Sequence, residues 1–189
     1  MFDGWDRAFP DVTIAAVDLQ DGIDVATATH EDYAHAVVKA AWTVPSPVAL
    51  CGWSMGGLAA LQAAQRLDPQ SVVLLESSPP GETQGFDGSI EPLSGTFDPE
   101  EAYGRFPPGM RSRPESVPAR AERKRGISVP TLPCPSLVVS SDDFREERGA
   151  AVAALYGSDL MDLPGLGHWD LVRSPEVRRR VADWLVGGS

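Results

Sequence analysis

The stretch that decides the fold is Gly52-Trp53-Ser54-Met55-Gly56-Gly57. An apolar run, Val48 to Cys51, precedes it, and an alanine-rich, helix-forming run, Leu58 to Leu67, follows it. We therefore expect a strand, a sharp turn with serine at its apex, and then a helix. The pattern Gly-x-Ser-x-Gly in this setting is typical of a nucleophile elbow.

The spacing of this motif has a physical reason. Ser54 must adopt a strained backbone conformation so that its hydroxyl projects clear of the sheet. A β-carbon at Gly52 or Gly56 is expected to clash where the strand and helix backbones approach most closely. Free N–H groups at the helix start point at the reaction centre, so the Met55 N–H is predicted to stabilise an oxyanion. Trp53 and Met55 suggest an apolar acyl pocket, although either could simply pack.

Bulk properties exclude several classes of function. A chain of 189 residues is long enough for one domain with a sizeable core. Its net charge of −11 argues against nucleic acid or an anionic membrane as partner. No secretory signal begins the chain, and no apolar stretch approaches the ~18 residues of a membrane span, so a soluble cytoplasmic protein is expected. Cys51 and Cys134 make no disulfide framework, and Cys51 is expected to be a buried thiol.

The rest of the chain alternates strands and helices. Besides the elbow, we expect strands over 11–19, 72–75, 136–140 and 159–163, and helices over 30–42, 146–156 and 175–186. This order predicts an α/β fold, a mostly parallel sheet with helices on both faces, in a single domain spanning 1–189. An irregular region rich in proline and glycine, about 78–134, is predicted to be a lid that shapes the substrate site. Its basic run, Arg120 to Gly126, could receive an acidic substrate group, but a solvated lid surface is the favoured interpretation.

A serine nucleophile needs a base, and the chain has three histidines. His30 and His35 lie at a helix start and in a helix body, and we interpret them as a capping or surface residue and a surface residue. His168 lies in a glycine-rich loop after the last strand. Because loops at the carboxyl ends of parallel strands share one edge of the sheet, His168 is predicted to be the general base for Ser54.

The base in turn needs a carboxylate to fix its tautomer. Asp142 and Asp143 directly follow the 136–140 strand at the same edge, and we prefer Asp143 over Asp142 as this acid. Asp170 is too close in sequence to His168 to be the first choice. The histidines have no ligand spacing with each other or with cysteine, and no lysine completes a phosphate loop, so neither a metal nor another cofactor is predicted.

These motifs resemble those of the α/β-hydrolase family. The resemblance covers most of the chain from Val12 onward and rests on the elbow, on Pro135-Ser-Leu-Val-Val-Ser-Ser-Asp-Asp143 and on Gly165-Leu-Gly-His168. The order Ser, Asp, His is the family's own. The resemblance implies Asp143 as the acid, a cap at the insertion, and a likeness to compact serine esterases and thioesterase-like members.

The chain departs from the family at its start. Family members open with a strand and a loop, often containing His-Gly, that supplies a second oxyanion N–H. Only the end of the helix that follows, around Trp5, matches here, and losing one such donor typically lowers turnover ~10²–10³-fold. Two explanations are open. Either Met1 is not the functional start or the chain is a fragment; the alternative is that the 11–19 strand moves beside the elbow strand in a reduced sheet.

The sequence therefore predicts a serine hydrolase that cleaves an ester or thioester through an acyl-enzyme on Ser54, with a small acyl-containing molecule as its partner. The alternative is a catalytically weak or inactive binding protein that keeps the fold, or a fragment of a hydrolase. No oligomeric state is indicated.

Overall fold

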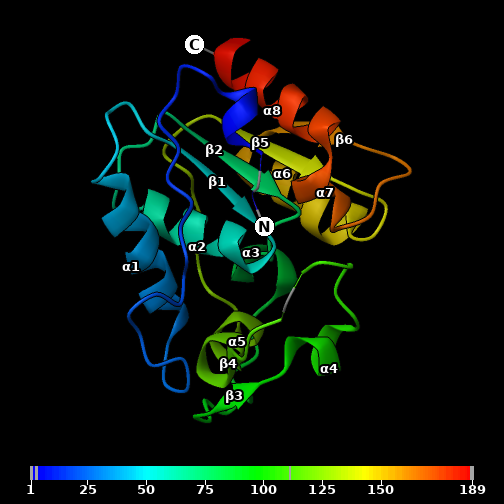
Figure 1. Ribbon diagram of the computed structural model, residues 1–189. Helices are drawn as coiled ribbons and strands as arrows, with labels where there is room; N and C mark the ends of the chain where they lie inside the picture. The colour runs from blue at the N-terminus through cyan, green and yellow to red at the C-terminus, as the bar shows by residue number, and fades with distance from the viewer. Residues whose placement is uncertain (1, 3, 111, 188–189) are drawn as a thin grey trace.

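A four-stranded parallel sheet lies at the centre of the computed structural model, which describes residues 2, 4–110 and 112–187 (Figure 1). Its strands, in spatial order, are β1 (Ala49–Trp53), β2 (Ser71–Leu75), β5 (Ser136–Ser140) and β6 (Asp159–Asp162). All three pairings are parallel. Because the strands run the same way, their carboxyl ends, and the loops that follow them, collect at one edge of the sheet.

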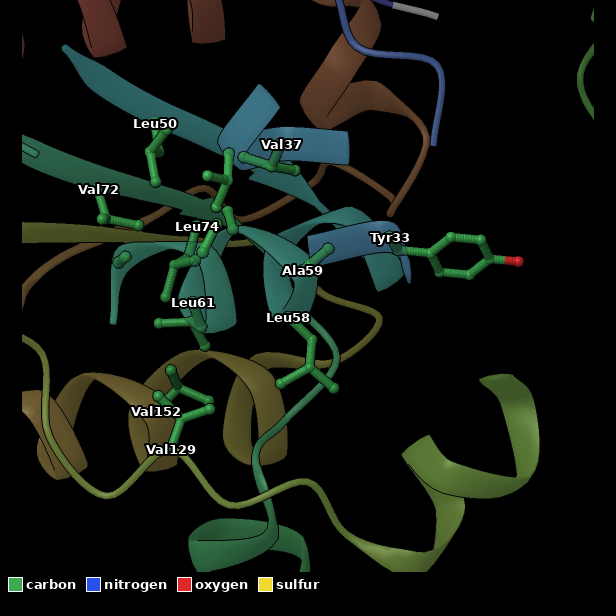
Figure 2. Close-up of a cluster of buried hydrophobic side chains, with 14 of the residues drawn as sticks. Tyr33, Val37, Leu50, Leu58, Ala59, Leu61, Val72, Leu74, Val129 and Val152 are labelled. Carbon is green, nitrogen blue, oxygen red and sulfur yellow. The ribbon is translucent and has the colours of Figure 1, made fainter. Parts of the chain in front are cut away.

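Helices cover both faces of this sheet, as the alternation of side chains along the strands requires. Leu74 and Val138 pack into one apolar cluster with α1 (His30–Ala41), α2 (Met55–Ala64) and α6 (Ala151–Tyr156); Figure 2 shows much of it. Leu75 and Val139 face the opposite way, into a second cluster with α7 (Asp170–Arg173) and α8 (Pro175–Gly187). The expected α/β fold is confirmed.

Local sequence signals explain where the helices begin. Thr29 caps α1 through a capping box, in which its side chain accepts from the Asp32 N–H and the Asp32 carboxylate accepts from the Thr29 N–H. The helix expected over 146–156 consists of a π-helical turn, η2 (Arg145–Ala150), followed by α6. A short 3₁₀ turn, η1 (Asp6–Ala8), stands where the sequence indicated the tail of a helix, and Trp5 beside it is buried. No helix within the described part of the chain is long and apolar enough to cross a membrane.

The segment between β2 and β5 forms a small separate layer at one end of the sheet (Figure 1). Its elements are α3 (Gly81–Gln84), β3 (Thr96–Phe97), α4 (Pro99–Tyr103), β4 (Glu115–Ser116) and α5 (Val117–Arg125). β3 and β4 pair as a short antiparallel ribbon. The Ser116 hydroxyl donates to the Ala28 carbonyl at 2.5 Å, which fastens this insertion to the segment that leads into α1.

The strand expected over 11–19 does not form. Residues 12–17 are exposed, Val12 by 60% and Ile14 by 43%, and β1 pairs with β2 alone among the described residues. The alternative of a reduced sheet with this segment beside the elbow strand is therefore wrong. Asp18 instead binds Arg113 of the insertion, and Gln20 donates to the Pro114 carbonyl, so the segment is held away from β1.

A cavity of about 1950 Å³ separates this segment from β1, and residues of both line it. Adjacent strands must lie about 4.8 Å apart to share hydrogen bonds, which the intervening cavity prevents. The open edge also corrects the expectation for Cys51, which is exposed rather than buried. Both Cys51 and Cys134 are free thiols, as the sequence indicated.

Candidate active site

The turn after β1 has the strained geometry expected of a nucleophile elbow. Ser54 adopts φ 52° and ψ −125°, a region that side chains with a β-carbon rarely occupy. Two main-chain hydrogen bonds hold it there, from the Ser54 N–H to the Leu75 carbonyl (3.1 Å) and from the Ser78 N–H to the Ser54 carbonyl (2.8 Å). Met55 is the first residue of α2, where main-chain N–H groups have no acceptor within the helix.

Close packing at the elbow falls on Gly52, as expected, and on Gly57 in place of Gly56. A β-carbon at Gly52 would stand 2.5 Å from the Gly56 carbonyl oxygen, so the expectation for Gly52 is confirmed. A β-carbon at Gly56 would meet only the Leu19 side chain, at 3.9 Å, so the expectation for Gly56 is wrong. The tight position is Gly57, where the added carbon would lie 2.6 Å from Ser77 Cβ. The first turn of α2 therefore packs on the chain that leaves β2, and its glycine at this contact is Gly57.

His168 lies in the loop between β6 and α7, with its imidazole held on several sides. Its Nδ1 lies 2.6 Å from Oε2 of Glu76. The Trp53 ring stacks on the imidazole (centroids 4.5 Å apart), and the Phe144 ring meets it edge to face at 5.2 Å. The Trp53 indole N–H also donates to the His168 carbonyl at 2.9 Å. Trp53 therefore packs on the histidine and holds its main chain, and it also lines the cavity that contains Ser54.

Glu76 follows β2 and is completely buried. Its backbone has φ 42°, and Ser54 and Glu76 are the two non-glycine residues of the described chain with positive φ. Oε1 accepts from both the N–H (2.6 Å) and the hydroxyl (2.5 Å) of Ser141, while Oε2 faces His168. Burial alone would raise the pKa of Glu76, but the hydrogen bonds from His168 and Ser141 together outweigh it and lower the pKa. The carboxylate is therefore ionised at neutral pH beside the imidazole.

Asp143, predicted to be the orienting acid, makes no hydrogen bond to the imidazole among the described contacts. Its Oδ2 accepts instead from the His168 main-chain N–H at 2.6 Å. Asp142 accepts from the Gly165 N–H and pairs with Arg145, and Asp170 accepts from the Gly167 N–H. All three aspartates thus bind the main chain of the histidine loop. Among these carboxylates, Glu76 alone contacts the imidazole of His168 in the described part of the chain.

Sequence reasoning missed Glu76, although a signal for it exists. It stands directly after the apolar run Val72 to Leu75, as Asp142 and Asp143 stand after the strand at 136–140. The rule that carboxyl ends of parallel strands share an edge applies equally to both positions. Because β2 is the neighbour of β1, its terminal carboxylate lies nearer the elbow than those that follow β5.

The other two histidines lie outside this arrangement. His30, interpreted as a capping or surface residue, is fully buried, and Thr29 is the cap. Burial lowers the pKa of His30 to about 4, and its Nδ1 lies 2.5 Å from the Gln62 side-chain oxygen. His35 is exposed on α1, as expected.

Ser54 and His168 line the same cavity, which also reaches Trp53, Met55 and Asp143. The insertion closes part of it, since Phe106 packs against Trp169 with ring centroids 4.8 Å apart. Within the described residues, no group of three or more His, Cys, Asp or Glu side chains gathers in a way that could hold a metal ion.

Comparison with known proteins concerns the family and the fold. The family model described as alpha/beta hydrolase family matches residues 4–183. The chain belongs to the alpha/beta hydrolase family. No curated protein gives a significant match.

Several solved hydrolases share the fold. RedJ, a thioesterase from the prodiginine biosynthetic pathway of Streptomyces coelicolor, is 20% identical with a TM-score of 0.62, covering 100% of this chain and 80% of its own. An esterase from Thermogutta terrifontis is 16% identical with a TM-score of 0.57, covering 87% and 75%. The carboxylesterase CesB from Bacillus subtilis is 16% identical with a TM-score of 0.54, covering 92% and 73%. At these identities the likeness concerns the fold alone.

Proposed function

We propose that this protein hydrolyses a carboxylic ester or thioester through an acyl-enzyme on Ser54. The observation that carries the proposal is the buried Glu76 carboxylate on Nδ1 of His168, in a cavity that the histidine shares with a strained Ser54. A serine hydroxyl becomes a useful nucleophile only beside a base whose tautomer is fixed. The solved proteins that share the fold include a thioesterase and esterases, which supports this reaction class.

In this mechanism, Nδ1 of His168 carries its proton toward Glu76, which leaves Nε2 free to accept the Ser54 proton. The Ser54 oxygen then attacks the acyl carbon, and the Met55 N–H donates to the oxyanion that forms. His168 returns the proton to the departing alcohol or thiol. Water, deprotonated by the same imidazole, releases the acid and restores Ser54.

The roles of the carboxylates follow from what each one contacts. We assign the orienting role to Glu76, because it is buried and faces the imidazole. Asp143, predicted for that role, is proposed to fix the main chain of the histidine loop. Trp53 holds the same loop from the opposite side.

A fluorophosphonate probe tests the proposal directly. We expect stoichiometric labelling of the wild-type chain, none of Ser54→Ala, and turnover of p-nitrophenyl butyrate or butyryl-CoA that the same substitution abolishes. Ser89→Ala is a matched control that removes an exposed hydroxyl bonded, among the described residues, only to Asp87, outside the cavity. Absence of labelling in the wild type would contradict the proposal and favour a binding protein that keeps the fold.

A further inference from the structure

Two arginines of the cavity, Arg123 and Arg148, have no carboxylate within ion-pair distance among the described residues. Each belongs to a different element, α5 of the insertion and η2 after β5. Both side chains are partly buried. Unpaired cations that are removed from water cost free energy, so an anion between them would stabilise the site.

Ser78 links Arg123 to the main chain of the nucleophile through two hydrogen bonds. Its Nη1 donates to the Ser78 hydroxyl at 3.1 Å, and the Ser78 N–H donates to the Ser54 carbonyl. Nη2 donates to the Tyr103 hydroxyl at 2.9 Å. Its Nε is buried without a hydrogen-bond acceptor among the described residues. A guanidinium in this state has a donor to offer and no carboxylate within ion-pair distance among the described residues.

Arg148 lines the same cavity near His168. The part of the cavity that Arg123 and Arg148 line is called the corner. Its guanidinium carbon lies 3.8 Å from the centroid of Phe144, the ring that contacts His168. Burial lowers the pKa of Arg148, and the charge of Arg123 lowers it further, while Glu76 and Glu147 act in the opposite direction. The two arginines are therefore close enough to repel each other, and the repulsion is relieved when an anion binds to both.

Three of the acidic groups around this corner, Asp18, Asp143 and Glu76, have other partners. Asp18 is bound by Arg113, and the Asp143 carboxylate accepts from the His168 N–H. Glu76 is held by His168 and Ser141. Glu115 also lines the cavity; burial raises its pKa, the charges of Arg123 and Arg120 lower it, and it makes no ion pair within the described chain. Two arginines without an ion-paired carboxylate among the described residues therefore line the cavity of Ser54, in a protein whose net charge is −11.

We propose that Arg123 and Arg148 bind an oxyanion group of the substrate, so that the protein acts on acidic acyl esters or thioesters in preference to neutral ones. This inference rests on the proposed function and names the substrate class of the same site. It also gives a role to the basic run of the insertion, for which a solvated surface was the favoured interpretation. A carboxylate on the acyl chain and a phosphate on the leaving group offer the same chemistry, and the test separates them.

The test compares kcat/KM for matched substrate pairs. p-Nitrophenyl hydrogen glutarate against p-nitrophenyl butyrate places a carboxylate on the acyl chain, and butyryl-CoA against butyryl-N-acetylcysteamine places phosphates on the leaving group. Since hydrogen bonds to a charged group contribute about 1.5–3 kcal/mol, we expect one pair to show a preference for the anionic member of roughly 10–100-fold. Added salt should reduce this preference.

Arg123→Gln and Arg148→Gln should each lower that preference about tenfold or more, because the loss falls mainly on the anionic member. Arg179→Gln, an exposed arginine of α8 paired with Asp183, is the matched control and should leave the ratio unchanged. A wild-type ratio near one for both pairs, with Ser54-dependent hydrolysis of the neutral ester intact, would overturn this inference and leave the proposed function standing. The wild-type ratio needs no variant, so a misfolded substitution does not prevent the test.

If no ester is hydrolysed and the fluorophosphonate probe does not label Ser54, the proposed function is wrong, but the anion site can still be tested. Glutarate binding, followed by fluorescence of Trp53 and Trp169, then decides whether the corner binds anions. Quenching that Arg123→Gln and Arg148→Gln abolish would support the anion site. No quenching in the wild type would overturn it.

Discussion

Two carboxylates flank His168, and they do different work although both end strands of one sheet. Glu76 follows β2, is fully buried, and faces the imidazole Nδ1; Asp143 follows β5, is exposed, and accepts from the His168 main-chain N–H. Strand order explains the division, because β2 lies next to the elbow strand and β5 lies one strand further away. A carboxylate on the side chain governs protonation, whereas a carboxylate on the main chain governs loop position.

The sharpest test of this difference is Glu76→Gln. The amide keeps the shape of the carboxylate but cannot hold the reactive tautomer or stabilise the imidazolium, so kcat should fall by about 10³–10⁴. Esterase assays at neutral pH measure the loss of kcat.

Asp142→Asn serves as the control for Glu76→Gln, since its carboxylate contacts the same loop only at Gly165 and otherwise pairs with Arg145 of η2. A Glu76→Gln enzyme with more than a tenth of wild-type kcat would assign the orienting role elsewhere.

The spacing that brings Glu76 to the elbow depends on Gly57. An alanine there would place its β-carbon 2.6 Å from Ser77 Cβ, one residue after Glu76, and should lower the free energy of unfolding by about 1–3 kcal/mol through overpacking. Gly56→Ala is the matched control: its β-carbon meets only the Leu19 side chain at 3.9 Å, and helix propensity favours alanine by about 1 kcal/mol. Urea unfolding of the two variants measures the difference, and equal stabilities would contradict the close contact.

Ser141 also interacts differently with Glu76 and Asp143. Its hydroxyl donates to the Glu76 carboxylate (2.5 Å), whereas it accepts a longer hydrogen bond from the Asp143 main-chain N–H (3.3 Å). Since the folded-state pKa of Glu76 lies below its ordinary value of 4.5, its stabilising contribution is present above that pH and is lost as pH falls through the folded pKa. Ser141→Ala removes one of the hydrogen bonds that lower this pKa. Acid unfolding should then begin at higher pH, with a loss of about 1 kcal/mol at neutral pH.

Ser140→Ala is the control for that prediction, since this neighbouring buried serine donates to Asp162 instead. Acid unfolding monitored by circular dichroism should separate the two variants. Identical acid midpoints would show that Ser141 does not set the ionisation of Glu76.

Much of this architecture could be predicted from sequence because local patterns determine it. The motif around Ser54, the apolar runs of β2 and β5, and the loop position of His168 each carry their own signal. Glu76 was missed because spacing along the chain does not say which strand end lies nearest the elbow. The 11–19 segment was mispredicted because its β-branched residues favour a strand only where a neighbouring strand is available for pairing. In the structure a cavity lies between this segment and β1.

The smallest expected effect belongs to Asp143→Asn. The amide oxygen can still accept the His168 N–H, so the loop keeps its main-chain bond and loses only the charge assistance, a change of about 1 kcal/mol or less. We expect kcat/KM to fall by less than about tenfold, because the main-chain hydrogen bond that holds the loop remains. Esterase assays run beside Glu76→Gln decide the comparison. A loss as large as that of Glu76→Gln would mean that Asp143 swings onto the imidazole during turnover and that the two carboxylates exchange roles.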